Sequence, residues 1–231
     1  GKSGPGGARA GPGHRQLMWA VVPIKGFDAP KQRLASVLSP EERSALAEHM
    51  LRDVLAALVD LDGVVVISGD EATLNAARWS GVRVMRERQP GGYSAAVRQA
   101  GEALAGEGVA AMMHVPGDIP LITGAEVAQI ADLVSPEPGA CVVPSHDHDG
   151  TNCLALWPPD LLQPAFGPDS FNRHCQLLRD SGVEPNVLEL DGFALDIDTP
   201  DDLRLFCAGH GDCGSLQYLR ASGIAARVSQ D

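Results

Sequence analysis

Short apolar runs alternate with helix-like segments along most of the chain, and this alternation constrains the fold more than any other feature. Residues 19–24 (WAVVPI) are typical of a buried strand. Ser39, Pro40 and Glu42 then form a helix-start signal, an S-x-x-E capping box with proline at the first helical position. Strands that alternate with helices favour right-handed β-α-β units around a mostly parallel sheet.

The same pattern places the other elements in one α/β domain. Further strands are expected at 64–68, 82–86, 109–115, 140–144, 152–157 and 187–190. Further helices are expected at 71–79, 94–105, 124–134, 170–181, from Pro200, and at 215–222. We assign residues 18–231 to this domain. Residues 1–17 are Gly-rich without an apolar stretch, so we interpret them as a disordered tail or an expression remnant, not a signal peptide.

Charge and cysteine content exclude several classes of function. The formal net charge of -12 argues against a nucleic-acid partner, and no apolar run is long enough to span a membrane. The five cysteines form no C-x-x-C pair, which argues against a zinc knuckle or a secreted disulfide framework and favours the cytoplasm. These features are compatible with a homodimer. An acidic protein that binds an anionic substrate needs a metal ion, backbone N–H groups or a local cluster of cations.

Three carboxylates follow predicted strands, where ligands bind in parallel sheets. Asp118 lies in the G-D-I-P sequence after the strand at 109–115. Asp196 and Asp198 belong to L-D-I-D-T-P, and on an extended strand their side chains share one face. Adjacent carboxylates repel unless a cation lies between them, and oxygen ligands suit Mg²⁺. The alternatives are an ordinary turn at Asp118 and a helix cap at Thr199, although capping leaves Asp196 unexplained.

A cluster of cations follows the first strand. Lys25, Lys31 and Arg33 lie within nine residues of this acidic chain, next to Gly26. Such a loop can surround a triphosphate with N–H groups and basic side chains. The alternative is a solvated turn, because lysine and arginine are usually exposed.

Two further segments offer hydrogen-bond donors. D-G-T-N (149–152) leads into a strand, and F-G-P-D-S-F-N-R-H (166–174) opens a helix whose first N–H groups are free for an anion. The alternative for Asp169 and Ser170 is a helix N-cap. The H-D-H-D run at 146–149 resembles a metal site, but its loop-forming neighbours favour a solvated loop.

Taken together, these motifs resemble the 2-phospho-L-lactate guanylyltransferase family of coenzyme F-420 biosynthesis, which includes enzymes described as using phosphoenolpyruvate or 3-phosphoglycerate. The resemblance runs from about Trp19 to the C-terminal helix. The motifs that carry it, in chain order, are V-P-I-K…K-Q-R-L-A, P-G-D-I-P, G-T-N, F-G-P-D-S-F-N-R-H and L-D-I-D-T-P.

The resemblance implies a Rossmann-like nucleotidyltransferase (GT-A-type) fold and a Mg²⁺-dependent transfer from GTP to a small phosphorylated carboxylic acid. It implies that Asp118, Asp196 and Asp198 hold Mg²⁺ and, with Lys25, are catalytic. The nucleotide would contact Pro23, Lys25, Gly26, Lys31, Arg33, Gly92, Ser94, Pro116 and Asp118. The acceptor would contact Thr151, Gly167, Ser170 and His174.

One departure from the family pattern concerns the nucleotide. Family members usually carry Gly-Leu-Asn-x-Ala after the third strand, where this chain has Gly92-Tyr93-Ser94-Ala95-Ala96. The shorter Ser94 predicts looser selection of the base or ribose. Two rival functions stay open: another nucleotidyltransferase of this fold, for a sugar phosphate, a pterin or a methylerythritol phosphate, and a catalytically silent nucleotide-binding regulator.

Overall fold

A seven-stranded sheet forms the centre of the computed structural model, which describes residues 18–26, 31–78, 81–88, 91–135, 137–209 and 211–229. Its order is β3-β2-β1-β4-β6-β5-β7. The strands are β1 (Met18–Pro23), β2 (Gly63–Ser68), β3 (Arg83–Arg86), β4 (Ala111–His114), β5 (Gly139–Pro144), β6 (Thr151–Trp157) and β7 (Asn186–Val187).

The direction of the strands decides which loops meet. β1, β2, β3 and β4 pair in parallel, so their carboxyl ends lie at one edge of the sheet. β6 pairs antiparallel with both β4 and β5. The amino end of β6, at Thr151, therefore lies at the same edge as the carboxyl end of β4. This reversal brings the D-G-T-N segment to the loop that carries Asp118.

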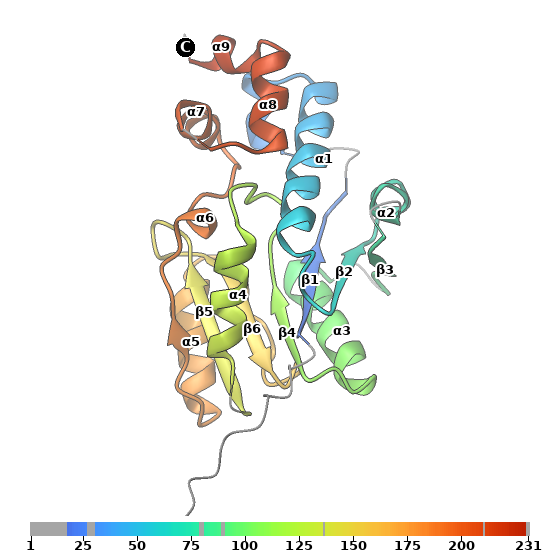
Figure 1. The fold of residues 1–231 in the computed structure, drawn as a ribbon, viewed down its shortest axis with the longest axis vertical. Helices are drawn as coiled ribbons and strands as arrows, with labels where there is room; N and C mark the ends of the chain where they lie inside the picture. The colour runs from blue at the N-terminus through green and yellow to red at the C-terminus, as the bar shows by residue number, and fades with distance from the viewer. Residues whose placement is uncertain are drawn as a thin grey trace, which may run out of the picture.

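Helices connect and cover the strands (Figure 1). They are η1 (Gln32–Ser36), α1 (Pro40–Ala57), α2 (Glu71–Arg78), α3 (Tyr93–Gly106), α4 (Gly124–Leu133), α5 (Ser170–Asp180), α6 (Asp191–Ala194), α7 (Pro200–Ala208), α8 (Gly214–Ala221) and α9 (Ile224–Val228). Capping boxes begin α1 at Ser39, α4 at Thr123 and α7 at Thr199, each with the reciprocal side-chain and backbone hydrogen bonds.

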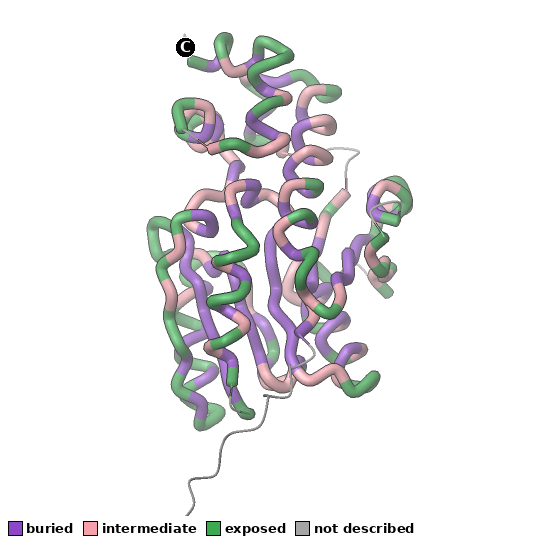
Figure 2. Tube along the Cα trace, viewed as in Figure 1, coloured by how far each residue is buried: buried purple, intermediate pink, exposed green. Residues whose placement is uncertain are grey.

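The central strands β1, β2, β4, β5 and β6 are buried, which Figure 2 shows as purple strands beneath partly exposed helices, whereas the edge strands β3 and β7 are more exposed. Alternate residues of β1 point to opposite sides. Val22 packs in a cluster with the C-terminal half of α1 and with α4. Val21 packs in a second cluster with α3 and α5. The result is a three-layer α/β/α arrangement, in which both faces of the sheet are apolar.

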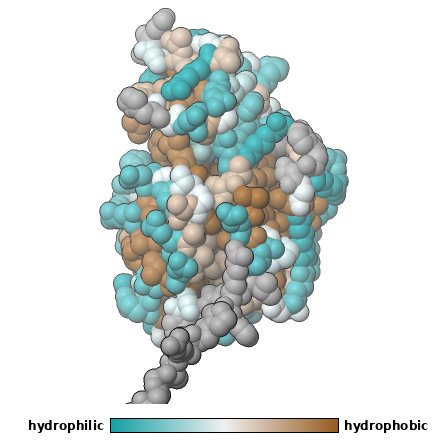
Figure 3. Space-filling model, in the orientation of Figure 1, coloured by the Kyte–Doolittle hydropathy of each residue, from teal (hydrophilic) through white to brown (hydrophobic). Residues whose placement is uncertain are grey.

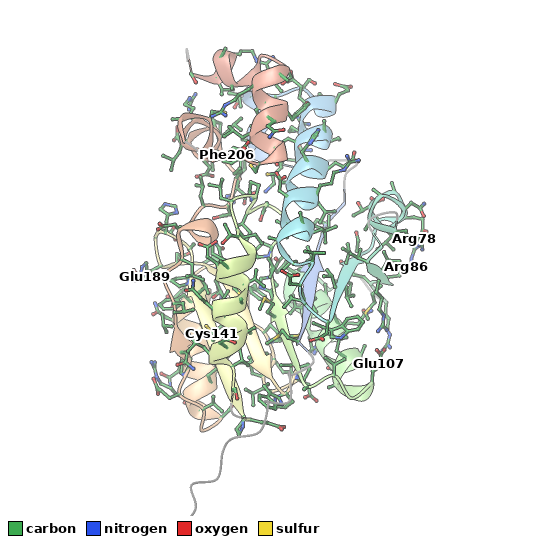
Figure 4. The ribbon with its side chains drawn as sticks, viewed as in Figure 1. Arg78, Arg86, Glu107, Cys141, Glu189 and Phe206 are labelled. Atoms are coloured by element: carbon green, nitrogen blue, oxygen red, sulfur yellow. The ribbon has the colours of Figure 1, made fainter. Side chains whose placement is uncertain are left out.

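A third hydrophobic cluster lies beyond the edge of the sheet. It joins η1 and the N-terminal half of α1 to α7, α8 and α9, which lie at the top of Figure 1. Phe206 of α7 is buried in it (Figure 4), and Leu46 and Met50 of α1 complete it. Hydrophobic side chains gather in the band between these upper helices and the sheet (Figure 3). The helix α1 therefore belongs to two packing clusters.

The structure confirms the predicted α/β class and most element positions. The segment 195–198 is not a strand as predicted; it is extended chain joined to the Asp118 loop by one bond, from Ile197 N to Asp118 O at 3.1 Å. The predicted strand at 187–190 is shorter, as β7 covers only Asn186–Val187. The sequence interpretation missed η1, α6 and α9, which are only four or five residues long.

The predicted tail at 1–17 lies outside the described residues, as does part of the cation-bearing loop at 27–30. No helix among the described residues is long and apolar enough to cross a membrane.

Candidate active site

A cleft of about 860 Å³ opens at the edge of the sheet where β1, β4 and β6 meet. The loops after β1 and β4, the start of α3, the start of β6, the loop before α5 and the segment before α7 all contribute to it. A smaller groove of about 460 Å³ lies between α1 and α4; its charged lining residues are aspartates. Only the larger cleft combines cations, carboxylates and hydroxyl groups, so it is the candidate active site.

Lys31 lies between two of the predicted metal-binding carboxylates. Its Nζ atom is 2.6 Å from Oδ2 of Asp118 and 2.6 Å from Oδ1 of Asp198. Burial alone would lower the pKa of Lys31, but the charges of both carboxylates outweigh it and the pKa is raised. Lys31 therefore stays protonated and supplies the cation that two adjacent carboxylates require.

The three carboxylates differ in their surroundings. Burial, and then the negative charges of Asp118 and Asp198, raise the pKa of Asp196. Burial also acts to raise the pKa of Asp198, but Lys31, with smaller effects from Arg33 and Lys25, reverses this and lowers it. The Oδ1 atom of Asp118 is buried and finds no hydrogen-bond partner among the residues that the structure describes. An unpartnered buried carboxylate oxygen is costly, and a cation bound at this atom would satisfy it.

Gly117 allows the loops after β1 and β4 to approach each other. A Cβ atom on Gly117 would overlap the side chain of Ile24, which follows β1. Gly117 therefore lets the loop after β4 pack against the loop after β1. This contact brings Asp118 into reach of Lys31, and Lys25 and Arg33 also line the cleft.

The start of β6 and the loop before α5 are joined by hydrogen bonds. Asp149 accepts from the N–H of Asp169 through Oδ1 at 3.0 Å and from the N–H of Phe171 through its carbonyl at 3.3 Å. Asp169 is at the N-cap of α5 with a left-handed backbone and makes no side-chain cap hydrogen bond, so the capping alternative does not describe it. These bonds join the segments that carry Thr151, Gly167 and Ser170, which all line the cleft.

Ser94 connects the nucleotide side of the cleft to the acceptor side. The backbone N–H of Phe166 donates to Ser94 Oγ at 2.9 Å. The Phe166 ring packs against the rings of Tyr93, His114 and His174, with centroid separations of 5.1, 4.3 and 4.8 Å. The Tyr93 hydroxyl also lies 2.7 Å from His114 Nε2. The loop that carries Gly167 is thus fixed to α3 and β4.

Most of the predicted site residues line this one cleft. They are Pro23, Lys25, Gly26, Lys31, Arg33, Ser94, Pro116, Asp118, Thr151, Gly167, Ser170, Asp196 and Asp198. Gly92 does not line it, although its neighbours Gly91 and Tyr93 do. His174 does not line it either, because the ring is fully buried behind Thr151. The expectation of a direct His174 contact with the acceptor therefore does not fit its position.

Other residues of the cleft were not anticipated as site residues. Ala47 and Met50 of α1 line it beside Gln32. Helical spacing marks Met50 only as a core position, and no local signal shows that α1 reaches the site. Tyr93 could be found only as a departure from a family pattern.

Among the described residues, no group of three or more His, Cys, Asp or Glu side chains comes together in a way that could hold a metal ion by itself. Within the same described residues, neither the H-D-H-D run nor the three aspartates of the cleft forms such a group. Mg²⁺ commonly binds through one or two carboxylates and completes its shell with water and substrate phosphates. The unpartnered Oδ1 of Asp118 fits a site of that kind.

Known proteins similar to this chain agree with the geometry. The family model described as guanylyl transferase CofC like matches residues 18–231. A phosphoenolpyruvate guanylyltransferase of Rubrobacter xylanophilus is 39% identical over 203 residues, which is 87% of this chain and 97% of that protein. A 2-phospho-L-lactate guanylyltransferase of Methanothermobacter thermautotrophicus is 34% identical over 213 residues, covering 91% of this chain and 93% of that protein.

Solved structures show the same fold. A putative nucleotide-diphospho-sugar transferase from Desulfovibrio desulfuricans has a TM-score of 0.76 at 17% identity, over 93% of this chain and 98% of that one. A nucleotidyl transferase from Methanothermobacter has a TM-score of 0.57 at 20% identity, over 92% and 99%.

Proposed function

Because the chain belongs to the CofC-like guanylyl transferase family, we propose that it transfers GMP from GTP to the phosphate of a small phosphorylated carboxylic acid and releases pyrophosphate. The acceptor is phosphoenolpyruvate, 2-phospho-L-lactate or 3-phosphoglycerate, and the reaction serves coenzyme F-420 biosynthesis. Its five cysteines are free thiols, in keeping with a cytosolic enzyme.

The observation that carries this proposal is the division of one cleft into two chemically different halves. Lys25, Lys31 and Arg33 line one half, beside the carboxylates. Thr151, Gly167 and Ser170 line the other, with neutral hydrogen-bond donors. Cations suit a triphosphate, whereas the hydroxyl groups of Thr151 and Ser170 suit a single carboxylate. The cleft thus offers one place for GTP and one for a small phospho-acid.

The reaction needs no side-chain nucleophile. A phosphate oxygen of the acceptor is already ionised and attacks the α-phosphorus of GTP. The bond between the α-phosphorus and the bridging oxygen breaks, and that oxygen leaves with pyrophosphate. The protein's tasks are to align the two anions and to neutralise their charge. Lys25 and Arg33 hold the triphosphate, and the Thr151 and Ser170 side holds the carboxylate.

We propose Mg²⁺ as the metal of this site, held by Asp118, Asp196 and Asp198. When bound, it supplies positive charge to the phosphate oxygens of both substrates. The carboxylates fit that role, since Asp118 Oδ1 has no partner and the pKa of Asp196 is raised by burial and by its two neighbours. Lys31 orients Asp118 and Asp198 from the side of the triphosphate loop.

The rival nucleotidyltransferases act on larger acceptors. Phe166 and Tyr93 pack edge to face next to the predicted acceptor wall, and Ser94 ties the Phe166 backbone to α3. This packing fixes the loop that carries Gly167, and the hydroxyl groups beside it suit the carboxylate of a small acid, which a sugar phosphate lacks. A catalytically silent nucleotide-binding regulator would not need three carboxylates at the strand ends.

Release of pyrophosphate tests the proposal directly. The purified protein would be incubated with GTP, Mg²⁺ and each of the three phospho-acids, with a sugar 1-phosphate as the control acceptor. Mass spectrometry would identify the guanylylated product. We expect one of the acids to yield a product and the sugar phosphate to yield none. Turnover of the sugar phosphate alone would favour the rival enzyme, and binding of GTP without turnover of any acceptor would favour a regulator.

A further inference from the structure

His174 is buried and makes two hydrogen bonds that together determine where its proton lies. The backbone N–H of Ala165 donates to His174 Nε2 at 2.9 Å. A backbone N–H can only donate, so Nε2 must present its lone pair. The other ring nitrogen, Nδ1, lies 2.9 Å from Oγ1 of Thr151.

The ring is also neutral. Burial, with a smaller effect from the charge of Arg173, lowers the pKa of His174 to about 4. A neutral imidazole carries one proton, and because Nε2 accepts, that proton is on Nδ1. Nδ1 therefore donates to Thr151 Oγ1. The packing of the ring against Phe166, with centroids 4.8 Å apart, holds the imidazole in this orientation.

The bond from His174 also determines the direction in which the Thr151 hydroxyl can donate. Since Oγ1 accepts from His174, the hydroxyl hydrogen points away from the imidazole. Thr151 lines the cleft on the side of Gly167 and Ser170, so this hydrogen is available to a bound molecule there. A hydroxyl held as a donor favours an anionic oxygen over a group that itself donates.

We propose that His174 is a positioning residue that keeps the Thr151 hydroxyl oriented as a hydrogen-bond donor toward the carboxylate of the acceptor. The proposal rests on the function proposed above, and it replaces a direct contact between His174 and the substrate with an action through Thr151. It also explains why a titratable ring lies buried next to a site that needs no general base.

Two substitutions separate the two hydrogen bonds of the ring. His174→Asn places an amide donor near the position of Nδ1 and leaves Ala165 N–H without its partner. His174→Gln places an acceptor near the position of Nε2 and leaves Thr151 without its donor. We expect His174→Gln to raise the KM of the acceptor about tenfold, with kcat and the KM of GTP nearly unchanged. His174→Asn should keep the acceptor KM near the wild-type value but melt at a lower temperature. If acceptor KM and melting temperature change in parallel in both variants, the role of His174 is only structural.

A double variant tests the dependence on Thr151. Thr151→Val removes the hydroxyl, and adding His174→Gln to it should raise the acceptor KM no further. Thr151→Ser, which keeps a hydroxyl, should remain sensitive to His174→Gln. Independent, multiplying effects in the Thr151→Val background would overturn the proposal.

The protonation of the ring can be measured without turnover. In protein labelled with ¹⁵N at histidine, a long-range ¹H–¹⁵N spectrum at neutral pH should show His174 with the proton on Nδ1 and a bare Nε2. His174→Asn assigns the signal among the seven histidines. The opposite tautomer would overturn the inference even if the enzyme is active. Conversely, the expected tautomer in a protein that guanylylates none of the acids would show that the proposed function, and not the tautomer, is at fault.

Discussion

The ammonium nitrogen of Lys31 lies 2.6 Å from Oδ1 of Asp198, so a positive charge of the protein itself compensates one of the carboxylates at the predicted metal site. Asp118 shares the same ammonium. Asp196 has no direct contact of this kind among the hydrogen bonds and ion pairs of the described residues, and its raised pKa reflects burial and two negative neighbours. We therefore expect activity and stability to change by different amounts when each of the three carboxylates is replaced by a neutral side chain.

Asp196→Asn keeps the shape of the side chain and removes its charge. We expect kcat to fall more than about a hundredfold, because the charge that helps hold Mg²⁺ is lost. The melting temperature without metal should rise, because the repulsion from Asp118 and Asp198 is relieved. Pyrophosphate release and a thermal melt measure the two effects. Asp201→Asn, at a side chain of α7 that is 93% exposed and pairs with Arg204, is the control and should leave kcat unchanged without raising the melting temperature. Full activity of Asp196→Asn with Mg²⁺ would remove Asp196 from the metal site.

The basic side chains of the cleft should act on the nucleotide. Lys25→Ala and Arg33→Ala each remove a cation that lines the cleft, so we expect a weaker GTP affinity and slower transfer with little change in acceptor KM. Titration calorimetry with GTP and steady-state kinetics measure this. Arg98→Ala, on the exposed surface of α3, is the matched control. If Lys25→Ala and Arg33→Ala behave like the control, the loop after β1 is an ordinary solvated turn.

Nucleotide selectivity should depend on Ser94. Its Oγ atom accepts from the N–H of Phe166, so this short side chain is held toward the Phe166 loop and has only its hydroxyl hydrogen left for a bound nucleotide. We expect the wild type to discriminate GTP from ATP less strictly than Ser94→Asn does. The measurement is the ratio of kcat/KM for GTP to kcat/KM for ATP, compared between the wild type and Ser94→Asn. Identical ratios would show that this position does not read the nucleotide.

Hydroxyl groups of the acceptor wall should act on the acid. Thr151→Val and Ser170→Ala each remove a donor, and a lost hydrogen bond to a charged group costs about 1.5–3 kcal/mol. We therefore expect the KM of the acceptor to rise about tenfold to a hundredfold, with the KM of GTP far less affected. Ser181→Ala, whose hydroxyl bonds Leu177 at the far end of the same helix, is the control. A rise confined to the KM of GTP would reverse the assignment of the two halves of the cleft.

Stability should fall in mild acid partly through His174. Burial, and to a smaller extent Arg173, lower its pKa to about 4 from an ordinary value of 6.5. Above the ordinary value neither the folded nor the unfolded ring is protonated, and the stability is complete. As the pH falls below it, the unfolded chain takes up a proton that the folded protein does not, so stability is lost down to the folded pKa. Between about pH 7.5 and about pH 5 this ring should account for on the order of 2 kcal/mol.

Urea unfolding at both pH values measures that loss. His174→Asn is the comparison, because it cannot be protonated and retains the other buried histidine, His114, whose pKa is lowered too. The variant should lose less stability than the wild type over the same interval. An equal loss in both proteins would mean that the ring at position 174 does not contribute.

Much of the fold could be predicted because its signals are local. The capping boxes at Ser39 and Thr199 mark helix starts within a few residues. Continuous apolar runs, without polar residues in alternation, mark buried strands. Short helices such as α6 and α9 could not be predicted, because four or five residues are too few to show a helical period. The segment 195–198 differs for another reason: its alternating pattern reflects packing of Ile197 in the cluster of the upper helices, not pairing with a neighbouring strand.

The candidate site was predicted as a set of motifs but not as a set of contacts. Lys31 is 87 residues from Asp118 and 167 from Asp198, and no sequence pattern shows that one ammonium bridges them. Likewise, the pattern that marks His174 at the start of a helix does not show which side of Thr151 it occupies. Motifs locate chemistry along the chain, whereas pairing across strands that run in opposite directions depends on the topology of the sheet.

The helix α1 belongs both to the cluster on the sheet and to the cluster of upper helices, and this sharing governs the cooperativity of unfolding. If α7, α8 and α9 detached, Leu46 and Met50 would lose their partners while Leu51 and Val54 of the same helix stayed packed on the sheet. A helix cannot melt in one half without weakening the other, so the free energies of the two clusters are coupled. The backbone amides of α1 should thus exchange with solvent only when both clusters open, even though the helix lies at the margin of the sheet and forms a wall of the cleft.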